Sequence, residues 1–173
     1  MEALIDFIKI LVPAALVLYA MYLTVKAFLN KELEKTRLEI KEKNIEVVLP
    51  VRLQAYERIV LFLERMSPNN LVTRLNQAEM TAKVFQQIML REIRDEYNHN
   101  VSQQVYMSEE VWELVKNAKE DLIISINKAS ERMDEKNTSL DLAKQLFEEV
   151  IAKEVDPITL ALHEIKDEIR SSF

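Results

Sequence analysis

A strongly apolar segment, residues 4–29, opens the chain and is followed at once by dense Lys, Glu and Arg. Its uncharged part, residues 10–25, would extend roughly 24 Å as an α-helix. The hydrocarbon core of a bilayer is about 30 Å thick. Lys9 and Lys26 can close the gap, because a lysine stem lies along apolar surface while its ammonium group reaches the headgroups. We therefore predict a transmembrane anchor over residues 1–29.

Three further residues of the anchor have predicted roles. Pro13 lacks a backbone N–H, so we expect a mild kink near the outer end of the helix. Tyr19 and Tyr22 lie in its C-terminal half, where an aromatic ring can approach one membrane interface. The N-terminal end carries Glu2 and Asp6 beside a single lysine, which argues against a cleaved signal peptide.

Positive charge is concentrated behind the anchor. Lys9 precedes the apolar core, whereas the basic residues that follow it are Lys26, Lys31, Lys35, Arg37, Lys41 and Lys43. Because basic residues stay on the cytoplasmic side, we predict a single-pass protein of the inner (cytoplasmic) membrane with its N-terminus outside and its C-terminal domain in the cytoplasm. The absence of cysteine is compatible with a reducing compartment.

Residues 30–48, here called the stalk, continue the helix without a breaker before Pro50. Oppositely charged residues such as Glu39 and Lys43 stand four apart, which supports an exposed helix. A 4-3-4 spacing typical of a short coiled-coil seam is formed by Leu29, Leu33, Thr36 and Ile40. Two interpretations stay open: the stalk associates with other copies, or it packs as one helix on its own domain.

Residues 49–173 have the pattern of amphipathic helices joined by short connections, and no sustained alternation predicts strands. The expected helices begin near Leu49 with Pro50 in the first turn, near Leu71 after the Ser67-Pro68 break, at Asn76 (ending near Tyr97), after Ser108, after Thr138 or Ser139, and after Asp156. The predicted fold is all-α: a transmembrane helix, a charged stalk helix and a cytoplasmic antiparallel helical bundle over residues 49–173.

Two details of the bundle are open to a structural test. Residues 130–139 form the most exposed and charged loop, where we expect mobility. The helix that follows carries Leu140, Ala143, Phe147, Val150 and Ile151 as its apolar positions.

Composition excludes several classes of protein. The 173 residues include no glycine, so phosphate-binding loops of the Walker, Rossmann and kinase types and the G-x-S-x-G nucleophile elbow are missing. A net charge of −6 argues against nucleic acid, whose backbone requires a basic face. We expect no cofactor and no enzymatic activity.

One resemblance covers most of the chain. The segments LPVRLQAYER (residues 49–58), LFLERMSPNNLV and VWELVKNAKEDLI resemble an uncharacterised family of single-span, helical proteins from Bacteroidota. The resemblance implies a Gram-negative inner-membrane setting and no assigned activity. The layout is also similar to the membrane subunit b of bacterial ATP synthases, although Pro50 and Pro68 depart from the single long helix of that subunit.

The best candidate metal ligands are weak. Glu96 and His99 stand three residues apart, with Glu92 one turn earlier, so their donors would share a helix face as in half of a di-iron site. The other half is missing, because Leu160 occupies the position three residues before His163. The simpler interpretation is that Glu96 and His99 are polar residues near the end of a helix.

A candidate partner interface lies on the most apolar helix, at Arg52, Tyr56, Phe62 and Arg65. Together these observations predict a membrane-anchored scaffold or accessory subunit that contacts the lipid bilayer and binds other membrane or cytoplasmic proteins, as part of a multi-subunit inner-membrane complex. One alternative is a self-assembling structural protein, a homo-oligomer associated through span and stalk. A less favoured alternative is a small-molecule or metal-dependent activity in the bundle.

Overall fold

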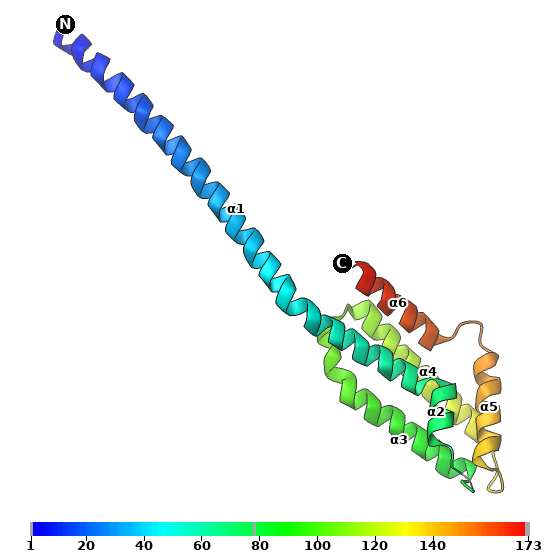
Figure 1. Cartoon of the computed structure of the whole chain (residues 1–173). Helices are drawn as coiled ribbons and strands as arrows, with labels where there is room; N and C mark the ends of the chain where they lie inside the picture. The colour runs from blue at the N-terminus through cyan, green and yellow to red at the C-terminus, as the bar shows by residue number, and fades with distance from the viewer. Residues whose placement is uncertain (1, 78, 172–173) are drawn as a thin grey trace. The chain divides into compact units, whose positions relative to one another are not determined.

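The computed structural model describes residues 2–77 and 79–171, with the side chains of residues 2–8, 10 and 44 outside the description. The described residues form six α-helices and one 3₁₀ helix (Figure 1). Their bounds are α1 Glu2–Met66, α2 Pro68–Leu75, α3 Ala82–Asn100, η1 Val101–Tyr106, α4 Glu109–Glu131, α5 Ser139–Ile151 and α6 Pro157–Ser171. The chain divides into two compact units, Met1–Leu49 and Pro50–Phe173. The all-α prediction is confirmed.

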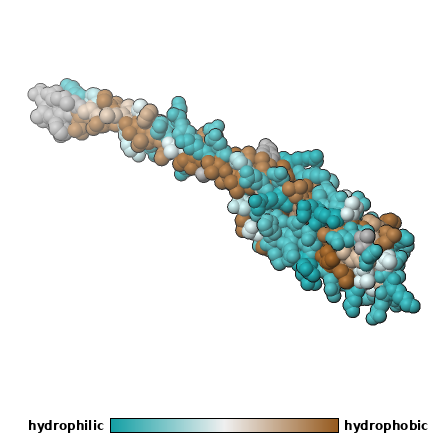
Figure 2. Space-filling view, turned by 60° about the horizontal axis from the view of Figure 1, so that its bottom comes forward, coloured by the Kyte–Doolittle hydropathy of each residue, from teal (hydrophilic) through white to brown (hydrophobic). Residues whose placement is uncertain are grey.

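The first unit consists of the N-terminal part of α1. Every described side chain from Leu11 to Lys43 is exposed, including the apolar ones (Figure 2). By length and composition this helix is apolar enough to cross a membrane, and none of its most apolar window is buried. Lys26 Nζ lies 5.8 Å from the centre of the Tyr22 ring, a cation–π contact within one turn.

One predicted helix start is wrong. We expected a new helix at Pro50, but α1 runs through this residue to Met66. The fixed φ of proline is compatible with a helix, and the missing N–H removes a single hydrogen bond, so a long helix with strong flanking segments can accommodate it. The kink expected at Pro13 stays a prediction, since α1 also runs through that residue without interruption.

The second unit is a helical bundle around one apolar core. Four helical segments run in alternating directions: the C-terminal part of α1, then α3, α4 and α6 (Figure 1). Helix α5 contacts α2, α3 and α4. The fully buried side chains include Ile59, Leu63, Phe85, Met89, Ile93, Val115, Ile126, Leu142, Leu146 and Ile165. Three aromatic rings pack between the helices. The ring centres of Phe62 and Tyr97 are 6.1 Å apart, and Tyr97 stacks on Trp112 with ring centres 5.8 Å apart. The prediction of a helical bundle is therefore confirmed.

Local capping explains most helix starts. The Ser108 hydroxyl accepts from the Val111 N–H, and the Asp156 carboxylate accepts from the Ile158 N–H just after Pro157. Thr138 forms a capping box with Asp141, in which each side chain accepts from the other residue's backbone N–H. These predicted caps are confirmed.

The start of α3 differs from the prediction. The helix begins at Ala82, not Asn76, with Thr81 as its cap. The preceding segment pairs with the loop before α5: the Ala82 N–H donates to the Asn137 carbonyl (3.0 Å), and the Ser139 N–H donates to the Met80 carbonyl (2.8 Å). These two hydrogen bonds form an isolated antiparallel bridge between Thr81 and Thr138. The backbone groups in the bridge are therefore not available for the hydrogen bonds of a longer helix.

Two smaller predictions are also corrected. The short helix after Ser67 starts at Pro68, three residues before the expected Leu71, because proline suits the first helical turn. On α5 the buried apolar side chains are Leu142, Ala143 and Leu146. Of the other expected residues, Phe147 and Val150 pack partly buried against the core, whereas Leu140 and Ile151 are exposed.

Candidate functional site

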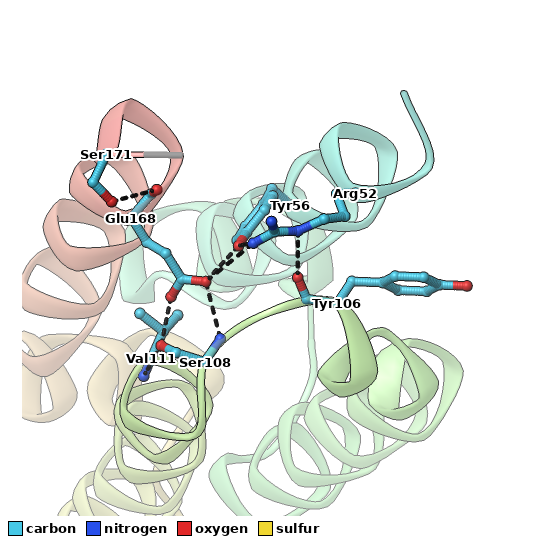
Figure 3. A network of polar contacts seen from close by, with 7 residues as sticks. All are labelled: Arg52, Tyr56, Tyr106, Ser108, Val111, Glu168 and Ser171. Atoms are coloured by element: carbon cyan, nitrogen blue, oxygen red, sulfur yellow. Dashed lines mark hydrogen bonds and ion pairs between the residues drawn. The ribbon is translucent and has the colours of Figure 1, made fainter. Parts of the chain in front are cut away.

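A polar cluster of the bundle is centred on Glu168 of α6 (Figure 3). Its carboxylate accepts from the Ser108 backbone N–H (2.9 Å), from the Ser108 hydroxyl (2.5 Å) and from the Tyr56 hydroxyl. Because Ser108 caps α4, the carboxylate also lies at the positive end of that helix dipole. We call Arg52, Tyr56, Ser108 and Glu168 the Glu168 cluster.

Arg52 extends this cluster to a fourth element. Its Nη2 donates to the Tyr56 hydroxyl (2.9 Å) and lies 3.8 Å from Glu168 Oε1. Its Nε donates to the carbonyl of Tyr106, the last residue of η1 (3.1 Å). The cluster therefore joins α1, the end of η1, the start of α4 and α6 (Figure 3).

The cluster fixes Glu168 as a carboxylate. Burial alone would raise the pKa of Glu168, but hydrogen bonds from Ser108 and Tyr56 and the nearby Arg52 charge outweigh it and hold the pKa below its usual value. Burial and the bond to this carboxylate raise the pKa of Tyr56. A carboxylate engaged by these donors holds elements together. It is poorly suited to proton transfer, for which a pKa near the working pH is best.

A second, more exposed cluster links α1, α2 and α3. Arg65 donates from Nε to Glu96 Oε1 (2.8 Å) and lies 3.8 Å from Glu92. Arg74 of α2 also binds Glu92. An open surface depression beside these pairs is lined by Glu92, Asp95, Glu96 and His99.

The comparisons with known proteins identify a family but no activity. A model for a family of unknown function (DUF7935) matches residues 2–172. The chain belongs to this family. No curated protein and no solved structure matches the chain.

The family match spans both units, so the apolar N-terminal helix and the bundle occur together in the DUF7935 pattern. The resemblance to a family without assigned activity agrees with this match. The Bacteroidota setting and the single membrane span that the resemblance implied stay predictions.

The structure assigns other partners to the candidate metal ligands. Glu92 and Glu96 face arginines, Arg65 and Arg74, whose charges compete with any cation for the same oxygens. Among residues 2–77 and 79–171, no group of three or more His, Cys, Asp or Glu side chains is arranged to hold a metal ion. The second histidine, His163, is exposed beside Glu164 and Asp167 on α6, away from the residues that line the depression.

Two of the four residues of the candidate partner interface are buried in the structure, and two are partly exposed. Tyr56 and Phe62 are buried in the bundle core, with 2% and 1% of their surface exposed. Neither side chain can contact a partner in this conformation, which corrects the prediction. The apolar character that suggested an interface is used for internal packing. Arg52 and Arg65 are partly exposed, and both are engaged in the two clusters.

The candidate anchor residues lie together on one helix. Side chains of Lys9, Pro13, Tyr19, Tyr22 and Lys26 are all exposed on α1. Their proposed contacts with lipid remain a prediction, since the structure contains the chain alone.

Sequence reasoning missed Glu168 and the second role of Ser108. Glu168 lies 60 residues from Ser108 and 112 from Tyr56 along the chain, so no local spacing connects them. The available signal was Ser108 itself, which was recognised as a helix cap but not as a donor to another helix.

We expect Glu168→Gln to lower the free energy of unfolding by about 1–3 kcal/mol at pH 7, because Gln cannot accept charge-assisted bonds from Ser108 and Tyr56. A lowered folded-state pKa means that the carboxylate stabilises the fold fully above its ordinary pKa of about 4.3 and loses this contribution as pH falls through the folded-state value. Urea unfolding of the full chain in mild detergent, followed by circular dichroism at pH 7 and pH 3, measures both effects.

The matched control is Glu57→Gln on the exposed face of α1, for which we expect a change below about 0.5 kcal/mol. Equal effects of the two substitutions, or a Glu168→Gln deficit that does not shrink at pH 3, would contradict the role assigned to Glu168.

Proposed function

We propose that this protein is a membrane-tethered, non-enzymatic scaffold or accessory subunit, whose N-terminal helix anchors a protein-binding helical bundle at the cytoplasmic face of the inner membrane. The observation that carries the proposal is the exposed apolar surface of α1, on which the large apolar side chains from Leu11 to Leu29 are exposed to between 46% and 68%. Such a surface is far larger than the patches that soluble monomers expose, so lipid or protein must cover it.

Anchoring is favoured over a cleaved signal sequence by the distribution of charge. Acidic Glu2 and Asp6 precede the apolar core, where a signal peptide carries basic residues. The stalk behind it is rich in lysine, which supports a cytoplasmic bundle by the positive-inside rule. The inner-membrane setting rests on the resemblance to single-span proteins of Bacteroidota.

Protein binding is favoured over catalysis by how the polar groups are used. The carboxylates of both clusters are engaged by arginine, serine or tyrosine donors, and Glu168 has a lowered pKa. The bundle also exposes apolar side chains at Val105, Ile151 and Val155. Val105 borders an open groove between α1 and η1, also lined by Val51, Gln54, Ala55, Arg58, Ser102, Gln103 and Tyr106.

Self-assembly through span and stalk is the second candidate function. It is favoured by the seam residues Leu29, Leu33 and Ile40, each of which is more than half exposed. The two functions are compatible, because a scaffold can itself be an oligomer.

A reporter active only in the periplasm tests the orientation. Fused after Phe173 it should be silent, whereas fused before Met1 it should be active, because the basic stalk holds the bundle in the cytoplasm. Colony assays of both fusions at matched expression levels give the result. Activity of the fusion after Phe173 would overturn the proposed topology, and silence of both with full expression would argue against a span.

Native pull-down tests the scaffold role. We expect the full chain, purified from membranes in mild detergent, to retain stoichiometric partners detectable by mass spectrometry. Val105→Asp should deplete the partners that contact the groove, since it puts a charge at an exposed apolar position.

The control is Val84→Asp, which changes a half-exposed valine on α3. Partners that survive both substitutions would contradict the assignment of the groove, and a chain that purifies only with itself would contradict the scaffold role.

A further inference from the structure

The stalk carries a heptad pattern on exposed side chains. With Leu33, Ile40 and Val47 at position a, the d positions are Leu29, Thr36 and Lys43. The exposed fractions of Leu29, Leu33, Ile40 and Val47 are 54%, 61%, 55% and 70%. The apolar side chains of this stalk seam are therefore exposed in the structure.

Charges beside the seam select the orientation of a second copy. All g positions of this register are glutamate (Glu32, Glu39 and Glu46), and the e position of the middle heptad is Arg37. In a parallel pair, each g residue meets the e residue five positions later on the partner helix, so Glu32 meets Arg37 in both directions. In an antiparallel pair g meets g, which would bring glutamates together.

The residue types in the seam favour two strands. β-branched Ile40 and Val47 at position a, with Leu29 at d, match the preference of parallel dimers. Thr36 and Lys43 are the polar d residues, and polar groups in a seam lower stability while fixing the register. Leu38 and Ile45 lie on the opposite, f, face and are exposed to 62% and 52%.

We propose that two copies of this chain associate through residues 29–47 as a parallel, in-register, two-stranded coiled coil. This inference rests on the proposed function, because two chains anchored in one membrane with the same orientation can meet only in parallel. The seam is short, roughly 27 Å. The shared membrane compensates by raising the effective concentration of the second copy.

The dimer would hold two bundles in one complex and present each partner-binding surface twice. A scaffold of this kind gains avidity for a partner that is itself multivalent, without any new contact in the bundle.

Cysteine cross-linking tests the register on a chain that has no native cysteine. Leu33→Cys and Ile40→Cys should each form a disulfide-linked homodimer when full-length protein in membrane vesicles is oxidised with copper phenanthroline. In a parallel, in-register pair each a residue meets its own copy within disulfide range. The control is Leu38→Cys, since Leu38 is exposed as much as Leu33 (62% against 61%) but lies on the f face.

We expect the two a-position variants to cross-link at least about tenfold faster than Leu38→Cys, because disulfide formation requires a Cα separation below about 7 Å. Equal rates at all three positions would indicate random collision and overturn the proposal. Absence of homodimer at Leu33→Cys and Ile40→Cys, or capture of a different protein there, would also overturn it.

Charge reversal tests the predicted pairing independently. In the Leu33→Cys background, Glu32→Arg or Arg37→Glu alone should slow cross-linking, because each places like charges at the g–e′ contact. The double change Glu32→Arg with Arg37→Glu should restore the rate. Failure to restore it would contradict the parallel register.

The same vesicles separate this inference from the proposed function. If alkaline carbonate extracts the chain, the anchor is wrong, whatever the cross-linking shows. If the chain stays in the membrane and Leu33→Cys forms no homodimer, the anchor stands and the coiled coil is wrong.

Discussion

The exposed apolar surface of the N-terminal half of α1 is the main physical constraint on this protein. Every described apolar side chain from Leu11 to Leu29 is exposed, although burial of such surface is the main favourable term in folding. A helix of this kind cannot remain solvated, so its environment must be lipid or protein. The proposed tether follows from this requirement, whereas the proposed topology rests on the basic residues of the stalk and the proposed dimer on its heptad pattern.

In the bundle, by contrast, the described apolar and polar groups that are buried find their partners within the chain. Its core is closed by aliphatic and aromatic side chains from α1 to α6, and among the described residues no buried side-chain polar atom lacks a hydrogen-bond partner. The Glu168 cluster joins elements far apart in sequence, and the arginines beside Glu92 and Glu96 balance the carboxylates that resembled metal ligands. The apolar core and these polar contacts therefore use most of the bundle's own groups, and exposed apolar residues such as Val105 are available to a partner.

Features encoded locally were predictable, whereas features that depend on distant residues were not. The caps Ser108, Thr138 and Asp156 follow from short-range spacing and are present in the structure. The start of α3 was missed because the segment before it pairs with residues near Thr138. The apolar positions of α5 include exposed Leu140 and Ile151, since a short apolar helix has more than one possible face. Glu168 carries no local signal of its partners.

Alkaline carbonate extraction of membranes that contain the full chain, compared with a version that lacks residues 1–29, tests whether the N-terminal helix is a membrane tether. We predict that the full chain stays in the membrane pellet at its intact mass, as expected if the apolar part of α1 is inserted in lipid. The shortened chain should move to the soluble fraction and keep its helical circular dichroism. Release of the full chain by carbonate, or recovery of a chain cleaved after the apolar segment, would contradict the tether.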